Sequence, residues 1–75
     1  MLTYDITRGR GGDANGVSLR LFGHEVLWAS LLELDRPTAA CRAYFAYCGI
    51  RPDLIDTLCV ARDECLERGL IQEAK

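Results

Sequence analysis

The stretch from residue 17 to residue 34 most constrains the fold, because its apolar residues alternate on both sides of a short turn signal, as in a β-hairpin. Glycine enters the positive-φ region without steric cost, so Gly23 predicts a two-residue turn at Gly23-His24 with glycine at its first central position. Counted outward from this turn, one side of the hairpin holds three cross-strand pairs: Leu21 with Val26, Leu19 with Trp28, and Val17 with Ser30. We therefore expect this side to be the inner face of a sheet.

The opposite side of the hairpin also carries apolar residues, although it should meet water. On that side Phe22 is expected opposite Glu25 and Arg20 opposite Leu27, and Leu31 follows. An apolar centre with a charged rim is typical of a protein-binding surface. The pattern predicts five partner-binding residues: Phe22, Leu27, Leu31, Arg20 and Glu25. Two other interpretations remain open: helices cover this face and make it ordinary core, or the chain from Leu27 onward is helical and the patch does not exist.

The rest of the chain predicts an α+β fold in a single domain, residues 1–75. Strict alternation indicates a strand at residues 2–7, and the hairpin supplies strands at 17–22 and 25–32. Pro37 and Pro52 suit the first turns of helices and Gly49 suits a helix end, which predicts helices at 37–48 and 52–68. We expect a three-stranded antiparallel β-meander followed by two α-helices packed on one face. The first helix is apolar almost all round, so we expect it to be central and covered on several sides.

Length and composition favour a small soluble domain that associates with something else. A chain of 75 residues buries only about 60% of its unfolded surface. Oligomerisation, for example as a homodimer, or binding to a partner is therefore expected. The sequence has no run of about 18 apolar residues and no basic leader before an apolar stretch. We expect no membrane association and a cytoplasmic location.

Residue types that carry chemistry are sparse. Six, ten and five residues separate the four cysteines, so no C-x-x-C pair suggests a metal site, and buried free thiols are expected. The single histidine, His24, is expected at an exposed turn with no nucleophile placed beside it. We predict no catalytic residues, no metal and no cofactor, and therefore not an enzyme.

The loop after the first strand offers an alternative function. Arg8-Gly9-Arg10-Gly11-Gly12 resembles the short arginine-glycine elements of RNA-binding tails, and four glycines predict a mobile loop over residues 8–16. Arg8 and Arg10, together with Arg20, would be the nucleic-acid contacts. The net charge of -2 supplies no broad field for a phosphate backbone, so direct nucleic-acid binding ranks second.

The leading hypothesis is a non-catalytic interaction protein, a small inhibitor or adaptor that binds a larger protein or nucleoprotein complex. It depends on the short chain, the sparse chemistry and the predicted apolar patch. By class analogy alone, with no motif match, such a chain is similar to small phage-encoded host inhibitors, including anti-CRISPR proteins.

Overall fold

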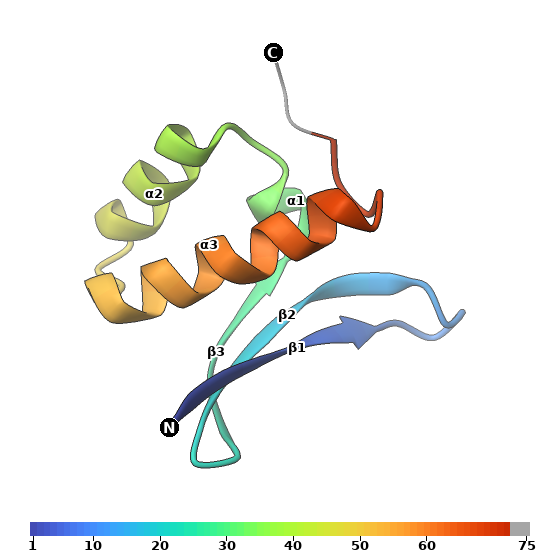
Figure 1. The fold of residues 1–75 in the computed structure, drawn as a ribbon, viewed down its shortest axis with the longest axis horizontal. Helices are drawn as coiled ribbons and strands as arrows, with labels where there is room; N and C mark the ends of the chain where they lie inside the picture. The colour runs from blue at the N-terminus through green and yellow to red at the C-terminus, as the bar shows by residue number, and fades with distance from the viewer. Residues whose placement is uncertain (73–75) are drawn as a thin grey trace.

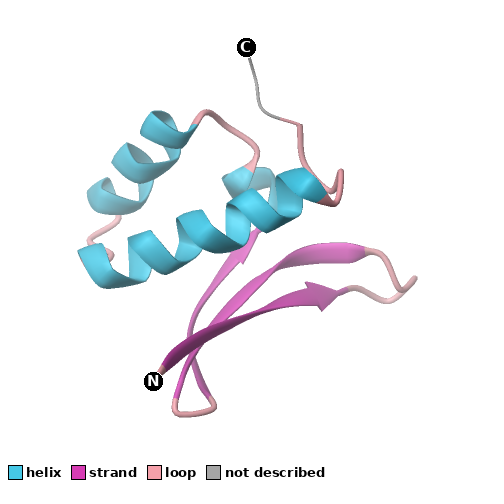
Figure 2. Cartoon of the chain, viewed as in Figure 1, coloured by secondary structure: helices cyan, strands magenta, loops and turns pink. Residues whose placement is uncertain are grey.

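The computed structural model describes residues 1–72, and these residues form a three-stranded sheet followed by helices (Figure 1). The described elements, in chain order, are β1 (Leu2–Arg8), β2 (Ala14–Leu21), β3 (His24–Ser30), α1 (Leu31–Leu34), α2 (Thr38–Tyr47) and α3 (Pro52–Glu67). The sheet is antiparallel in the order β1-β2-β3. All the helices lie on one face of it (Figure 2). The predicted α+β meander is thus confirmed.

The glycine-rich loop is shorter than its composition suggests. β1 continues to Arg8 and β2 begins at Ala14, so only residues 9–13 connect them. Gly9 N donates to Asp13 O at 2.8 Å, and the Arg8 guanidinium donates from Nη1 to Gly12 O at 2.9 Å. These bonds close a tight hairpin loop where we expected a longer connection over residues 8–16.

The predicted β2–β3 turn is one residue out of place. The two central residues are Phe22 and Gly23, with φ of 50° and 85°, and His24 already belongs to β3. Positive φ at both central positions is the pattern of a type I′ turn, which suits the twist of a hairpin. The expected Gly23-His24 turn is therefore wrong.

A second irregularity, near Val26, shifts the pairing of β3 with β2. Arg20 pairs with Glu25, but Leu19 pairs with Leu27, so the register shifts between these two rungs. A shift of one residue moves every later side chain to the other face of a strand. Leu27 and Ala29 consequently face the core, and Trp28 faces outward, which reverses the faces expected from the sequence.

Trp28 explains why this register is favourable on the outer face. A Cβ built on Gly16 would lie 2.5 Å from Trp28 Cζ2, so only glycine leaves room for the indole ring to lie against β2. The indole Nε1–H donates to Thr7 Oγ1 at 3.0 Å, across the sheet on β1. A large aromatic side chain thereby covers the gap that a strand glycine leaves.

The core lies between the inner face of the sheet and α3. The fully or nearly fully buried apolar residues come from β2, β3, the helices and the segment after α3: Val17, Leu19, Ala29, Leu34, Cys41, Phe45, Ile55, Leu58, Ala61, Cys65 and Ile71. The expected strand over 25–32 ends at Ser30, because Ser30 caps α1. Its hydroxyl accepts from Glu33 N at 3.2 Å while Glu33 Oε1 accepts from Ser30 N at 3.0 Å, a complete capping box.

Arg62 joins α3 to the segment between α1 and α2. Its side chain is buried, and its guanidinium donates from Nε to Leu34 O and Arg36 O, each at 3.1 Å. A further bond runs from Nη1 to Thr38 Oγ1 at 3.1 Å. One cation from α3 thus bonds the Leu34 carbonyl at the end of α1, which also accepts from Arg36 N, and the Arg36 carbonyl in the segment that follows.

The expectation that the first long helix is central and covered is wrong. α2 packs mainly against α3, and within α2 only Cys41 and Phe45 are buried. Its exposed residues are Thr38, Ala39, Ala40, Arg42, Ala43, Ala46 and Tyr47. The small alanine side chains made the helix apolar in composition without providing bulk that the fold must bury.

Candidate functional site

The β2–β3 turn presents the most unusual residue of the structure. Phe22 has φ of 50°, in the left-handed region, and its side chain is 78% exposed. A residue with a Cβ loses about 1 to 2 kcal/mol in this region, so Asn or Gly normally occupies it. Phe22 N donates to Met1 O at 3.0 Å, which holds the start of the chain beside the turn. An aromatic ring is therefore held in solvent on a strained but hydrogen-bonded turn.

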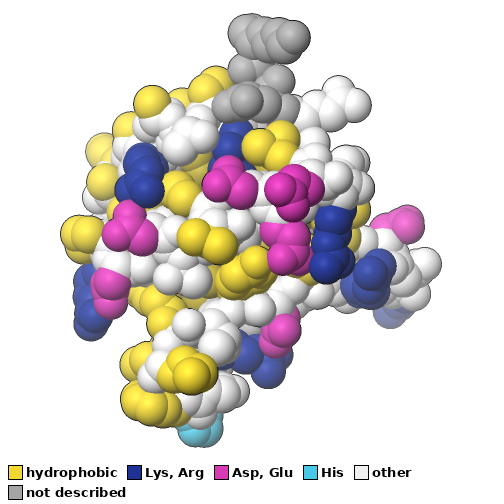
Figure 3. Space-filling view, in the orientation of Figure 1, with side chains coloured by type: hydrophobic (Ala, Val, Ile, Leu, Met, Phe, Trp, Pro, Cys, Tyr) yellow, Lys and Arg dark blue, Asp and Glu magenta, His cyan; other side chains and the backbone are white. Residues whose placement is uncertain are grey.

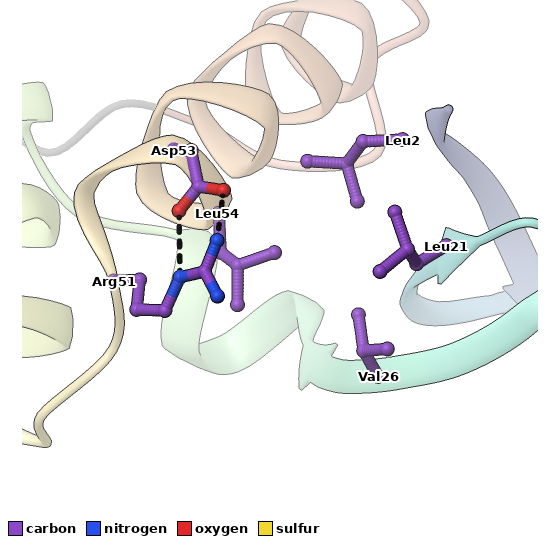
Figure 4. Close-up of a pocket in the computed structure, with 6 residues that line it drawn as sticks. All are labelled: Leu2, Leu21, Val26, Arg51, Asp53 and Leu54. Carbon is purple, nitrogen blue, oxygen red and sulfur yellow. Dashed lines mark hydrogen bonds and ion pairs between the residues drawn. The ribbon is translucent and has the colours of Figure 1, made fainter.

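A pocket lies at the same end of the sheet. It has a volume of about 120 Å³ and is lined by Leu2, Leu21, Val26, Arg51, Asp53 and Leu54. Each strand supplies one lining residue, and the start of α3 supplies the other three. Figure 4 shows the leucines and the valine of the sheet facing the start of α3 across the opening.

The pocket has apolar walls and a charged rim. Arg51 and Asp53 form an ion pair with Nη2 and Oδ2 2.6 Å apart and a second contact from Nε to Oδ1 at 3.2 Å. The hydrogen bond from the guanidinium lowers the pKa of the Asp53 carboxyl below its ordinary value. Both groups are thus charged at neutral pH, and together they carry no net charge.

We call these residues the sheet-end surface: Met1, Leu2, Leu21, Phe22, Val26, Arg51, Asp53 and Leu54. Four of its apolar side chains are exposed, namely Met1, Leu21, Phe22 and Val26. Figure 3 shows hydrophobic side chains gathered at this end of the molecule, beside the single histidine. Exposed apolar groups gathered around a concave site are typical of a surface that binds another molecule.

The structure brings only one of the five predicted partner-binding residues to this surface, namely Phe22. Leu27 and Leu31 are half-buried and pack against the core, so the interpretation of an outer apolar patch centred on them is wrong. Arg20 and Glu25 pair directly on the outer face of the sheet. The remaining residues of the sheet-end surface were missed, although the apolar start Met1-Leu2 was a usable signal.

The outer face of the sheet is polar around Trp28. Ser18 Oγ donates to Glu25 Oε1 at 2.7 Å, and Arg20 Nε lies 3.5 Å from Asp5 Oδ2. Because the cation is flanked by carboxylates, this face has no excess positive charge that would favour phosphate.

The residues predicted to contact nucleic acid do not form one basic patch. Arg8 is engaged with its own loop, and Arg10 is exposed on that loop. Arg20 lies on the outer face with Asp5.

The cysteines and the histidine have ordinary surroundings. Burial raises the pKa of the thiols of Cys41, Cys59 and Cys65, which keeps them protonated at neutral pH. His24 is exposed at the start of β3. Across residues 1–72, no group of three or more His, Cys, Asp or Glu side chains is arranged to hold a metal ion.

Within the described part of the chain, no helix has the length and apolar character needed to cross a membrane. Comparison with protein-family models, with curated proteins and with solved structures gives no significant match for this sequence. Any functional interpretation therefore depends on the surface itself.

Proposed function

We propose that this chain is a non-catalytic protein-interaction protein that binds another protein through the sheet-end surface, with Phe22 as the anchor. In this proposal it acts as a small inhibitor or adaptor of a larger protein or nucleoprotein complex. The inhibitor role also draws on the analogy with small phage-encoded inhibitors, which share its size class.

The observation that carries the proposal is the conformation and exposure of Phe22. The turn loses free energy by holding a phenylalanine at φ of 50°, and the ring, 78% exposed, recovers little by burial within the chain. Burying such a ring in a partner contributes about 1.5 to 3 kcal/mol, and aromatic anchors beside a pocket commonly dominate binding. Because Phe22 lowers the stability of the free protein, its presence is best explained by a contact with another molecule.

The polar chemistry supports a non-catalytic role. His24 is exposed at the start of β3, and burial raises the pKa of the three less exposed thiols above that of an active nucleophile. The charged pair on the pocket rim, Arg51 and Asp53, suits hydrogen bonds to a partner backbone at the edge of an apolar contact.

Affinity capture from the native cell extract tests this proposal. We compare the wild type with Phe22→Asn and with Leu32→Asn, a control that removes an equally exposed apolar side chain from α1, 84% exposed. We expect a protein that the wild type and Leu32→Asn retain and Phe22→Asn loses. Retention of the same proteins by all three would contradict the proposal, as would the absence of any specific protein.

The nucleic-acid alternative has a separate test. Arg8 and Arg20 are engaged within the chain, so we expect no gel shift with a single-stranded oligonucleotide at low salt. A shift that weakens steeply with added salt and with Arg10→Ala would favour the nucleic-acid function instead.

A further inference from the structure

We propose that, when no larger partner is bound, a second copy of this chain covers the sheet-end surface, so that the protein exists in a monomer–dimer equilibrium. This inference rests on the proposed function, because it assigns a partner to the same surface. It adds that self-association and binding to the larger partner exclude each other.

The sheet-end surface contains both halves of a contact. Phe22 projects into solvent, and the pocket begins at the neighbouring residue, Leu21. An apolar cavity of about 150 Å³ takes up benzene, so a pocket of about 120 Å³ that opens to solvent has room for most of a phenyl ring. Phe22 is not among the residues that line the pocket of its own chain. The ring and the pocket are therefore free to serve another molecule.

In a dimer with a two-fold axis, the contact between the Phe22 ring of one copy and the pocket of the other would occur twice. In a symmetric dimer the same patch meets itself, so a residue that contacts a site on the partner has that contact repeated in reverse. Phe22 of each copy would enter the pocket of the other, between the aliphatic walls formed by Leu2, Val26 and Leu54.

The charges on the surface permit this approach. Arg51 and Asp53 neutralise each other within one rim, at 2.6 Å between Nη2 and Oδ2. Two copies therefore meet without a net repulsion between their rims, and each guanidinium has a carboxylate of the opposite copy available. A surface with one sign of charge would have favoured a differently charged partner.

The extent of the surface sets the strength of the association. Four exposed apolar side chains per copy form a smaller contact than the roughly 1,200 to 2,000 Å² of a stable interface. We therefore expect a dissociation constant between about 1 μM and about 1 mM, weak enough for a larger partner to displace the second copy.

Sedimentation velocity of the intact chain tests the inference across protein concentrations from about 1 μM to about 1 mM. We expect the wild type to shift from monomer to dimer with concentration, and Phe22→Asn to remain monomeric throughout. Val26→Asp, which places a charge on an exposed wall of the pocket, should also remain monomeric. Leu32→Asn should dimerise like the wild type. Circular dichroism of each variant confirms that the fold is retained.

Two results would overturn self-association: a wild type that stays monomeric at the highest concentration, or a dimer that Phe22→Asn leaves unchanged. The capture experiment separates this failure from failure of the proposed function. If the wild type is monomeric but still captures a protein through Phe22, only self-association is ruled out. If the dimer depends on Phe22 but the chain captures no other protein, only the inhibitor or adaptor role is ruled out.

Discussion

Replacing Phe22 by a series of residues separates its effect on the stability of the fold from its effect on partner binding. Phe22→Asn and Phe22→Gly both place a residue that tolerates positive φ at this turn, whereas Phe22→Ala removes the ring and keeps the Cβ that causes the strain. The alanine variant is thus the matched control for the backbone effect.

The expected magnitudes follow from the geometry of the turn. At φ of 50° a residue with a Cβ loses about 1 to 2 kcal/mol relative to glycine, and asparagine recovers part of this through local hydrogen bonding. We expect Phe22→Asn to raise the free energy of unfolding by about 1 kcal/mol, which in a domain of this size raises Tm by about 4 to 8 °C. Phe22→Gly should gain less, because glycine also increases the entropy of the unfolded chain. Phe22→Ala should change stability little, since the ring is mostly exposed.

Urea unfolding followed by circular dichroism measures these differences, with all chains at a concentration where the wild type is monomeric. All three variants should lose the captured partner, including the two that are more stable. A gain in stability with alanine equal to that with asparagine would refute the strain argument. A loss of stability with asparagine would show that the ring stabilises its own chain.

Two further perturbations test the packing and the pH dependence of the fold. Arg62→Met should lower the free energy of unfolding by about 1.5 to 3 kcal/mol in urea titrations, because the carbonyls of Leu34 and Arg36 lose a buried cationic donor; a change below about 1 kcal/mol would contradict this role. Hydrogen bonds, first from Ser30 N and also from Tyr44 and the Ser30 hydroxyl, lower the pKa of Glu33 below its ordinary value of 4.5 in the folded state. Its stabilising contribution is therefore complete above about pH 4.5 and is lost as the pH falls through the folded-state pKa, so between about pH 6 and pH 3 the wild type should lose more stability than Glu33→Gln. Equal losses in the two chains would show that Glu33 does not contribute to acid sensitivity.

The order of elements was predictable because local signals agreed with one another. Proline and glycine marked the helix ends, so the expected helices at 37–48 and 52–68 differ by at most one residue at each end from Thr38–Tyr47 and Pro52–Glu67. Period-two alternation gave the first strand in the same way.

Neither the position of the β2–β3 turn nor the faces of β3 could be predicted from the sequence, and the reasons differ. A glycine with positive φ suits the first central position of one hairpin turn and the second of another, and Phe22 argued against the turn that forms. No glycine or proline marks the irregularity beside Val26. The irregularity at Val26 alone exchanged the faces of Leu27 and Trp28, and with them the predicted binding patch, because moving the turn by one residue shifts the pairing by two residues and keeps the faces.

The pocket depends on contacts between segments far apart in the sequence, such as Leu2, Val26 and Leu54, so local patterns could not reveal it. The short helix α1 is different, since Ser30 and Glu33 carry the capping-box spacing in plain sequence. Leu31 and Leu34 stand at helical spacing, and the cap at Ser30 marks where the strand ends and the helix begins.

The position of α2 has a consequence for the dynamics of the chain. This helix packs mainly against α3 and has few contacts with the sheet, whereas the sheet and α3 share most of the core (Figure 1). Segments with few buried contacts open locally at a lower free energy than the global unfolding transition. The amide hydrogens of α2 should therefore exchange with solvent while those of β2 remain protected. Opening of α2 would leave the turn that carries Phe22 and the strands beside it in place, although the pocket also depends on the start of α3.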